Sequence, residues 1–96
     1  MDDRETKISS ILHEAAETHH IVFRISDGED PDWATWYSEW LLHLSDLPSL
    51  LLTQPVRSEL TWKLVGLDKE YTSEPRAERW EDHYARELVT HFRGSA

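Results

Sequence analysis

Apolar side chains recur every three or four residues through the first quarter of the chain. From roughly Asp3 to Ile25 they share one arc of a helical wheel with a histidine. The positions in this arc are Ile8, Ile11, Leu12, Ala15, Ala16, His19, Val22 and Phe23. The spacing predicts an amphipathic helix, and Gly28 marks its end, because glycine readily takes the left-handed conformation that often follows a helix.

A second helix is predicted from Pro31 to about Ser45. Asp30 suits the N-cap, and Pro31 suits the first helical position, where its missing N–H is not needed. The face that we expect to turn inward is strongly aromatic and consists of Trp33, Trp36, Tyr37, Trp40, Leu41 and Leu44.

Three further segments follow. Pro48 to Leu52 is long enough only for a short helix or turn, whose leucines we expect to cover the core. A helix is predicted from Pro55 to about Tyr71 on the stripe Val56, Leu60, Leu64, Leu67 and Tyr71. The last helix is predicted from Arg76 to Phe92, with Trp80, Tyr84, Leu88 and Phe92 on one face.

These elements predict an all-α fold, a single domain over residues 1–96 with four main helices and a short fifth. We expect loose ends at residues 1–3 and 93–96. Short connections favour antiparallel neighbours, in either a bundle or an orthogonal array. The chain has no cysteine, so packing alone must hold the fold together.

The net charge of the chain favours some classes of binding partner and opposes others. Nineteen aspartates and glutamates outnumber ten lysines and arginines, which gives a formal charge of −9 at pH 7. Such a charge opposes binding to phosphate backbones and anionic lipid, and it favours a basic protein partner. The sequence has neither a secretory leader nor an apolar run near the roughly 20 residues that a membrane-spanning helix needs. We therefore expect a cytoplasmic protein that binds no nucleic acid and no membrane.

Two of the six histidines, His19 and His91, lie within apolar arcs. They could meet, together with Trp80 and Tyr84, in a pocket between the first and last helices, where an imidazole would act as acid or base. The alternative, and the commoner use of such positions, is a buried ring that donates a hydrogen bond. HExxH is absent, as is any other recognised metal motif, so we expect no metal site and no cofactor.

Trp62 and Val65 project away from the apolar stripe of their own helix. Gly66 follows them, although glycine in a helix interior costs about 1 kcal/mol relative to alanine and is often kept where another group approaches closely. Ile21 also lies off the main arc of its helix. Together these residues predict a second contact surface; the alternative is that the last helix or residues 50–52 cover Trp62.

Three segments carry a resemblance: Thr18-His19-His20, Asp27 through Tyr37, and Pro55 through Ser58. They resemble a group of small, acidic, uncharacterised bacterial proteins, and the resemblance covers most of the chain. It implies a bacterial cytoplasmic origin and brings no activity, cofactor or catalytic residue to this sequence.

The sequence favours a non-enzymatic interaction module, in its simplest form a homodimer, that associates through the aromatic surface near Trp62. The alternative is a small-ligand-binding or histidine acid-base domain with the pocket described above. No catalytic residue is assigned on either hypothesis.

Overall fold

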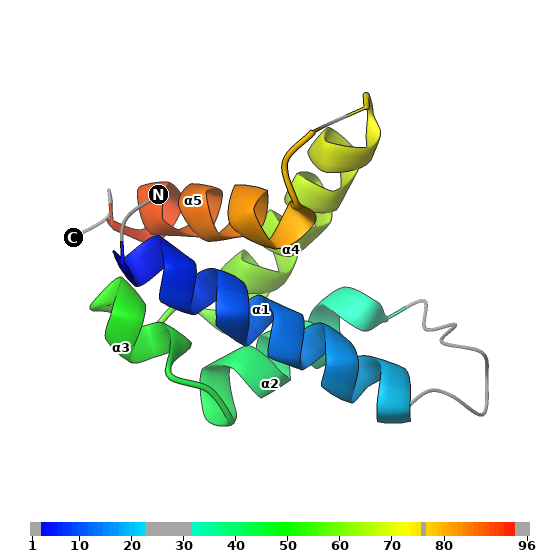
Figure 1. Cartoon of the computed structure of the whole chain (residues 1–96). Coiled ribbons are helices and arrows are strands. Elements are labelled where there is room, and N and C mark those ends of the chain that lie inside the picture. The colour runs from blue at the N-terminus through cyan, green and yellow to red at the C-terminus, as the bar shows by residue number, and fades with distance from the viewer. Residues whose placement is uncertain (1–2, 23–31, 76, 94–96) are drawn as a thin grey trace.

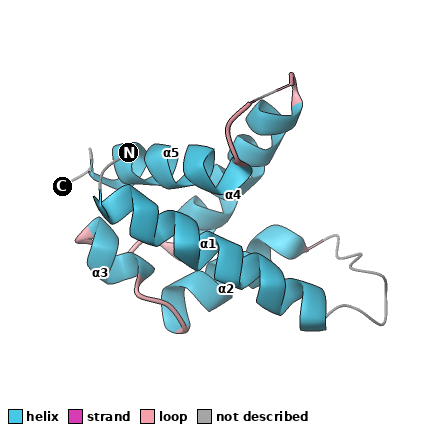
Figure 2. Cartoon of the chain, viewed as in Figure 1, coloured by secondary structure: helices cyan, strands magenta, loops and turns pink. Residues whose placement is uncertain are grey.

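A computed structural model of the chain describes residues 3–22, 32–75 and 77–93. Within these ranges it contains five helices and no strand, as Figure 2 shows. The helices are α1 (Asp3–Val22), α2 (Trp33–His43), α3 (Leu47–Leu51), α4 (Arg57–Thr72) and α5 (Trp80–Arg93). The helices pack against one another, so the prediction of an all-α fold with four main helices and a short fifth is confirmed.

The longest contact joins α1 and α5, which run antiparallel. Figure 1 shows the start of α1 beside the end of α5. Ser9 donates from Oγ to Asp82 Oδ1 at 2.7 Å, and one turn later on α1 the His13 Nδ1 atom lies 3.1 Å from Glu81 Oε2. The end of α1 and the end of α5 therefore lie at opposite ends of the pair.

The other long helices complete the core. α2 packs on α4, and α4 crosses the direction of α5 in Figure 1. Ser38 of α2 is fully buried, and its Oγ lies 2.7 Å from Thr61 Oγ1 of α4. The apolar residues with no exposed surface are Ile8, Leu12, Ala15, Leu41, Leu47, Leu60, Leu64, Leu67, Ala85 and Leu88. They are contributed by all five helices, so each element buries part of its surface in one shared core.

The short helix α3 behaves as expected of a cover. Leu47 and Leu51 are buried, and α3 contacts α1, α2 and α5. Pro48 lies in its first turn. Leu52 closes the helix in the left-handed conformation with φ 61° and leaves its side chain 73% exposed.

Three helices begin later than the sequence predicts. α4 starts at Arg57 rather than Pro55, since the Val56 carbonyl oxygen accepts a hydrogen bond from the Leu60 N–H. α2 starts at Trp33, because the Asp32 carbonyl oxygen accepts the first bonds from the N–H groups of Thr35 and Trp36. The predicted cap Asp30 and Pro31 lie outside the described residues. α5 starts at Trp80, and its first hydrogen bond runs from the His83 N–H to the Arg79 carbonyl.

Four residues predicted to face or cover the core are exposed: Val22 by 56%, Leu44 by 72%, Leu52 by 73% and Val56 by 64%. Each lies at or just beyond the end of a helix, where the helical periodicity that predicted its position no longer holds. Asp3 and Arg93, which were assigned to loose ends, belong to α1 and α5. The rest of those predicted ends lies outside the described residues.

None of the helices that the structure describes combines the length and apolar character needed to span a membrane.

Candidate functional site

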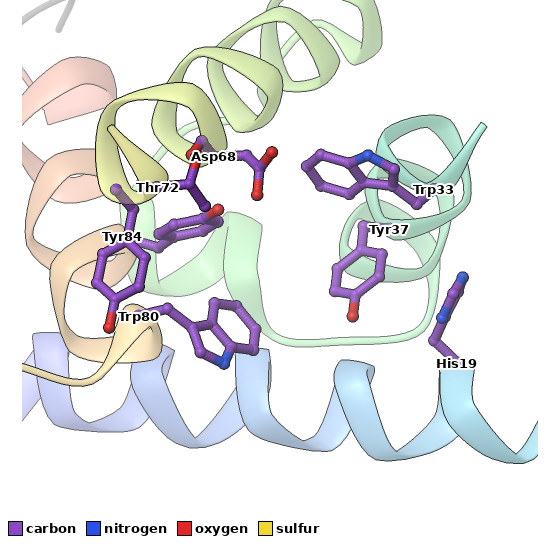
Figure 3. A pocket seen from close by; sticks show the side chains of 8 residues that line it. His19, Trp33, Tyr37, Asp68, Thr72, Trp80 and Tyr84 are labelled. Carbon is purple, nitrogen blue, oxygen red and sulfur yellow. The ribbon is translucent and has the colours of Figure 1, made fainter. Parts of the chain in front are cut away.

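A pocket of about 470 Å³ opens between α1, α2, α4 and α5. This volume is within the range of small-molecule sites, which hold ligands in mostly apolar clefts with a few polar groups. The lining side chains are His19, Trp33, Tyr37, Asp68, Tyr71, Thr72, Trp80 and Tyr84. Figure 3 shows the α2 rings on one side of the pocket and the α5 rings on the other.

Each aromatic wall is built from two residues one helical turn apart. On α2, Trp33 and Tyr37 meet edge to face, with ring centroids 5.8 Å apart and planes at 88°. On α5, Trp80 and Tyr84 meet in the same way at 5.1 Å and 76°. Edge-to-face contacts are stabilising, so both walls are held in fixed orientations before any ligand arrives.

His19 closes the α2 side of the pocket. The residue is 9% exposed and lies in the last turn of α1. Its ring centroid is 4.9 Å from that of Trp36 and 5.3 Å from that of Tyr37. The imidazole is thus packed among indole and phenol rings.

The α4 side supplies the polar groups. In Figure 3 the Asp68 carboxylate lies between the α2 and α5 walls. Thr72, one turn later, donates from its hydroxyl to the Asp68 carbonyl oxygen at 2.7 Å. The Tyr71 ring lies 6.4 Å from the Tyr84 ring. Asp68 is therefore the acidic side chain among the described lining residues.

The surroundings of the pocket raise the pKa of two phenols. Burial raises the pKa of Tyr84 well above its usual value of 10, and the negative charge of Asp68 raises it further. Burial also raises the pKa of Tyr37, with a second contribution from the charge of Glu81. Both phenols stay protonated at neutral pH, and the carboxylates make the local potential negative.

Three of the four residues that the sequence assigned to a pocket line this one, namely His19, Trp80 and Tyr84. The fourth, His91, does not: its Nε2 lies 3.0 Å from Glu59 Oε2 on α4. The antiparallel packing explains the separation, because His19 is at the end of α1 and His91 at the end of α5. The two imidazoles do not meet as the sequence suggested.

Trp62 is 67% exposed, so neither α5 nor α3 covers it. Its ring faces that of His91, with centroids 6.1 Å apart. Val65 is half-buried, and a methyl group added to Gly66 would meet no other described atom within 4 Å. Among the residues that the structure describes, none therefore requires glycine at this position. Ile21 is also exposed, by 63%, but it lies in the last turn of α1, at the opposite end of the α1–α5 pair from His91.

Sequence reasoning missed two buried or inward polar residues. Asp68 follows Leu67 of the α4 stripe, and its position beside that stripe was the available signal. His83 is 2% exposed and packs between Tyr71 and Tyr84, with ring centroids 5.8 and 6.3 Å away. It was overlooked because it precedes Tyr84 at the edge of the predicted apolar face.

Comparison of the chain with protein-family models, with characterised proteins and with solved structures finds no match.

Proposed function

We propose that this chain is a small-ligand-binding module whose aromatic pocket takes an organic cation. The single observation that carries the proposal is the Asp68 carboxylate in a pocket walled by two indoles and three phenols. Aromatic faces carry negative electrostatic potential, and cages of such rings bind alkylated ammonium groups. A carboxylate inside the cage adds a direct charge partner.

The charge of the pocket supports a cation over an anion. The Tyr37 and Tyr84 phenols are neutral, and their raised pKa values extend this to alkaline pH, so Asp68 is the charged group. An anionic ligand would meet the negative charge of Asp68 in a partly desolvated site, which is costly. The formal charge of the chain, −9 at pH 7, would also attract cations from a distance.

Binding is a better interpretation than acid-base catalysis. Only one imidazole, that of His19, reaches the pocket, and it is packed against Trp36 and Tyr37. A mechanism that uses two histidines is ruled out by the position of His91, whose Nε2 lies 3.0 Å from Glu59 Oε2 outside the pocket.

The test compares choline with its neutral isostere 3,3-dimethylbutanol by calorimetry and tryptophan fluorescence. We expect choline to bind more tightly than the isostere. Asp68→Asn should weaken choline about tenfold, the effect of roughly 1.4 kcal/mol, and leave the isostere unchanged. Asp46→Asn is the matched control, since Asp46 is exposed, lies outside the pocket and makes no side-chain cap bond. Equal affinity for both ligands, or equal effects of the two variants, would refute the proposal.

A second candidate function is association through the surface formed by Trp62, Val65 and Gly66. The observation that favours it is an indole that is 67% exposed beside a glycine with open space above it. A homodimer is its simplest form, and a basic protein is the partner that the charge favours.

Light scattering after size exclusion tests the homodimer. The wild type should be dimeric and Trp62→Ser monomeric, whereas Val56→Ser, at an equally exposed apolar residue, should stay dimeric. A wild type that remains monomeric at high concentration excludes the homodimer.

A further inference from the structure

His83 is a buried imidazole surrounded by charged groups. Its residue is 2% exposed on α5. On one side of the ring, Nδ1 lies 3.3 Å from Glu78 Oε1 and 3.4 Å from Arg86 Nη2. On the other side, Nε2 lies 3.2 Å from Glu70 Oε1, on α4.

The Nε2 atom of His83 differs from the other buried side-chain nitrogen and oxygen atoms of the described residues. It is fully buried and makes no hydrogen bond in the described part of the chain, although the Glu70 oxygen is close enough for one. The distance permits a hydrogen bond but the direction does not, because the ring nitrogen is not aimed at the oxygen. A buried polar atom without a partner costs about 1–3 kcal/mol, so such an atom calls for an explanation.

A second carboxylate reaches the same place. Glu87 follows His83 by four residues, and therefore lies on the same face of α5. One ligand atom from each of Glu70, His83 and Glu87 lies within 4.8 Å of the others. The three residues come from two helices that pack directly on each other.

We propose that Glu70, His83 and Glu87 bind a divalent first-row transition-metal ion, for which Zn²⁺ is the probe. One imidazole nitrogen and two carboxylate oxygens form a donor set that suits zinc and its neighbours. Three protein ligands leave at least one coordination position for water or another ligand.

The separation of the ligand atoms fits this assignment. Ligand atoms about 2.1 Å from one ion are about 3.0 Å apart in octahedral and about 3.4 Å apart in tetrahedral geometry. The His83 Nε2 to Glu70 Oε1 distance of 3.2 Å falls between these values. An ion shared by two ligand atoms also explains why the nitrogen approaches the oxygen without being aimed at it. Glu87 is partly exposed, so rotation of its side chain can close the remaining gap.

The far side of the ring supplies the support that metal-binding histidines usually have. His83 Nδ1 lies 3.3 Å from Glu78 Oε1. In the tautomer with its proton on Nδ1, that proton can be donated to Glu78 and the lone pair of Nε2 is left for the metal, as in carboxylate–histidine–zinc arrangements. In the other tautomer Nδ1 would accept from Arg86 Nη2 at 3.4 Å, so the proposal requires the first. Glu78 is itself held by Arg86, whose Nη1 and Nη2 donate to its two oxygens at 2.8 and 2.7 Å. The charges of Glu78 and Arg86 cancel, so this pair supports the ring without adding net charge beside it.

The competing account is a proton in place of the metal. A doubly protonated His83 would carry a positive charge between Glu70 and Glu78. The two accounts differ in what added metal does, because an imidazolium cannot ligate an ion.

Calorimetric titration of EDTA-treated protein with Zn²⁺ at neutral pH tests the proposal, with Co²⁺ absorption as the second readout. We expect one Zn²⁺ per chain. Glu87→Gln should weaken binding at least 100-fold, and Glu78→Gln, which changes only the support of the ring, should weaken it about 10- to 100-fold. His83→Gln should remove the site.

Matched controls separate this site from the other histidines. His13 and Glu17 on α1 have the same spacing as His83 and Glu87 but are exposed, with side chains 54% and 67% accessible. Glu17→Gln should leave Zn²⁺ affinity unchanged. Should His83→Gln fail to fold, the partly exposed Glu87 still decides the outcome. The proposal would be overturned if the wild type bound no Zn²⁺ below about 1 mM, or if Glu87→Gln and Glu17→Gln bound Zn²⁺ equally well. It would also be overturned if NMR showed that the His83 imidazole stays doubly protonated when zinc is added.

Discussion

The Tyr71 hydroxyl donates a hydrogen bond to the Glu78 carbonyl oxygen at 2.7 Å, and this bond ties the last turn of α4 to the segment that leads into α5. The same ring contacts Tyr84, which lines the aromatic pocket, and His83, which anchors the proposed metal site. Tyr71 thus contacts residues of both the aromatic pocket and the proposed metal site, and the connection from α4 to α5 positions both sites.

Removal of this hydroxyl should loosen the connection without unfolding the chain. Tyr71→Phe keeps the ring contacts and deletes one hydrogen bond, so we expect a loss of about 1 kcal/mol in the free energy of unfolding. Urea denaturation followed by circular dichroism measures it. Thr90→Val, which deletes an exposed hydroxyl that donates to the Arg86 carbonyl, is the control and should change stability less. Equal losses in the two variants would show that the Tyr71 bond has no special role.

Gly66 offers a test of the surface around Trp62. A methyl group there meets no other described atom within 4 Å, and residue 66 lies inside α4. Gly66→Ala should therefore raise the free energy of unfolding by about 1 kcal/mol through helix propensity alone. The measurement is made at low protein concentration, where association contributes least.

The same variant at high concentration reports on association. If a second copy packs closely on α4 at Gly66, the added methyl group should weaken the dimer while it stabilises the monomer. A destabilised monomer at low concentration would contradict the open space above Gly66, since no described atom lies close enough to account for the loss.

Features that depend on a single helix could be predicted from the sequence, whereas features that depend on the packing of two helices could not. The α1 and α4 stripes, with Ile8, Leu12, Leu60 and Leu64, follow from periodicity within one segment, and these residues are buried. The aromatic walls were likewise predictable, because Trp80 and Tyr84 are one turn apart on α5.

Sites formed by residues of two different helices could not be predicted from the sequence. His19 and His91 both lie in apolar arcs, but only the antiparallel order of α1 and α5 shows that they occupy opposite ends. His83 and Glu87 form an ordinary spacing on α5 until α4 brings Glu70 to the same ring. For Trp62, the sequence showed that the residue lies off the apolar stripe of its own helix, but only the structure shows that no described neighbour covers it.

A comparison of Leu52 with Leu44 tests whether the left-handed backbone at Leu52 is strained. Both are exposed, by 73% and 72%, but Leu52 has φ 61° whereas Leu44 has φ −120°. A left-handed conformation costs a non-glycine residue about 1–2 kcal/mol, which exceeds the entropic cost of glycine. Leu52→Gly should leave stability unchanged or raise it by up to about 1 kcal/mol, and Leu44→Gly should lower it by about 0.5–1 kcal/mol. Thermal unfolding of the two variants compares them, and the opposite ranking would contradict the strain at Leu52.

Alkaline pH should expose the buried phenol of Tyr84. Its pKa in the folded chain is raised above the value of about 10 that an exposed tyrosine has, chiefly by burial and then by the charge of Asp68. Below pH 10 the phenol is neutral in both states, and the stability that depends on its neutrality is fully present. Above that pH the unfolded chain ionises while the folded chain does not, so the free energy of unfolding falls by up to about 1.4 kcal/mol per pH unit from this group.

Tyr84→Phe isolates this contribution, because every other titrating group is unchanged. The variant should lose stability less steeply above pH 10 than the wild type does, and the difference in slope should vanish between pH 7 and 9. Urea midpoints across this range, with phenolate absorbance as a second signal, measure the two slopes. Parallel curves for wild type and variant above pH 10 would mean that Tyr84 ionises in the folded chain. The pocket would then be wetter than the packing of Trp80 and Tyr84 indicates.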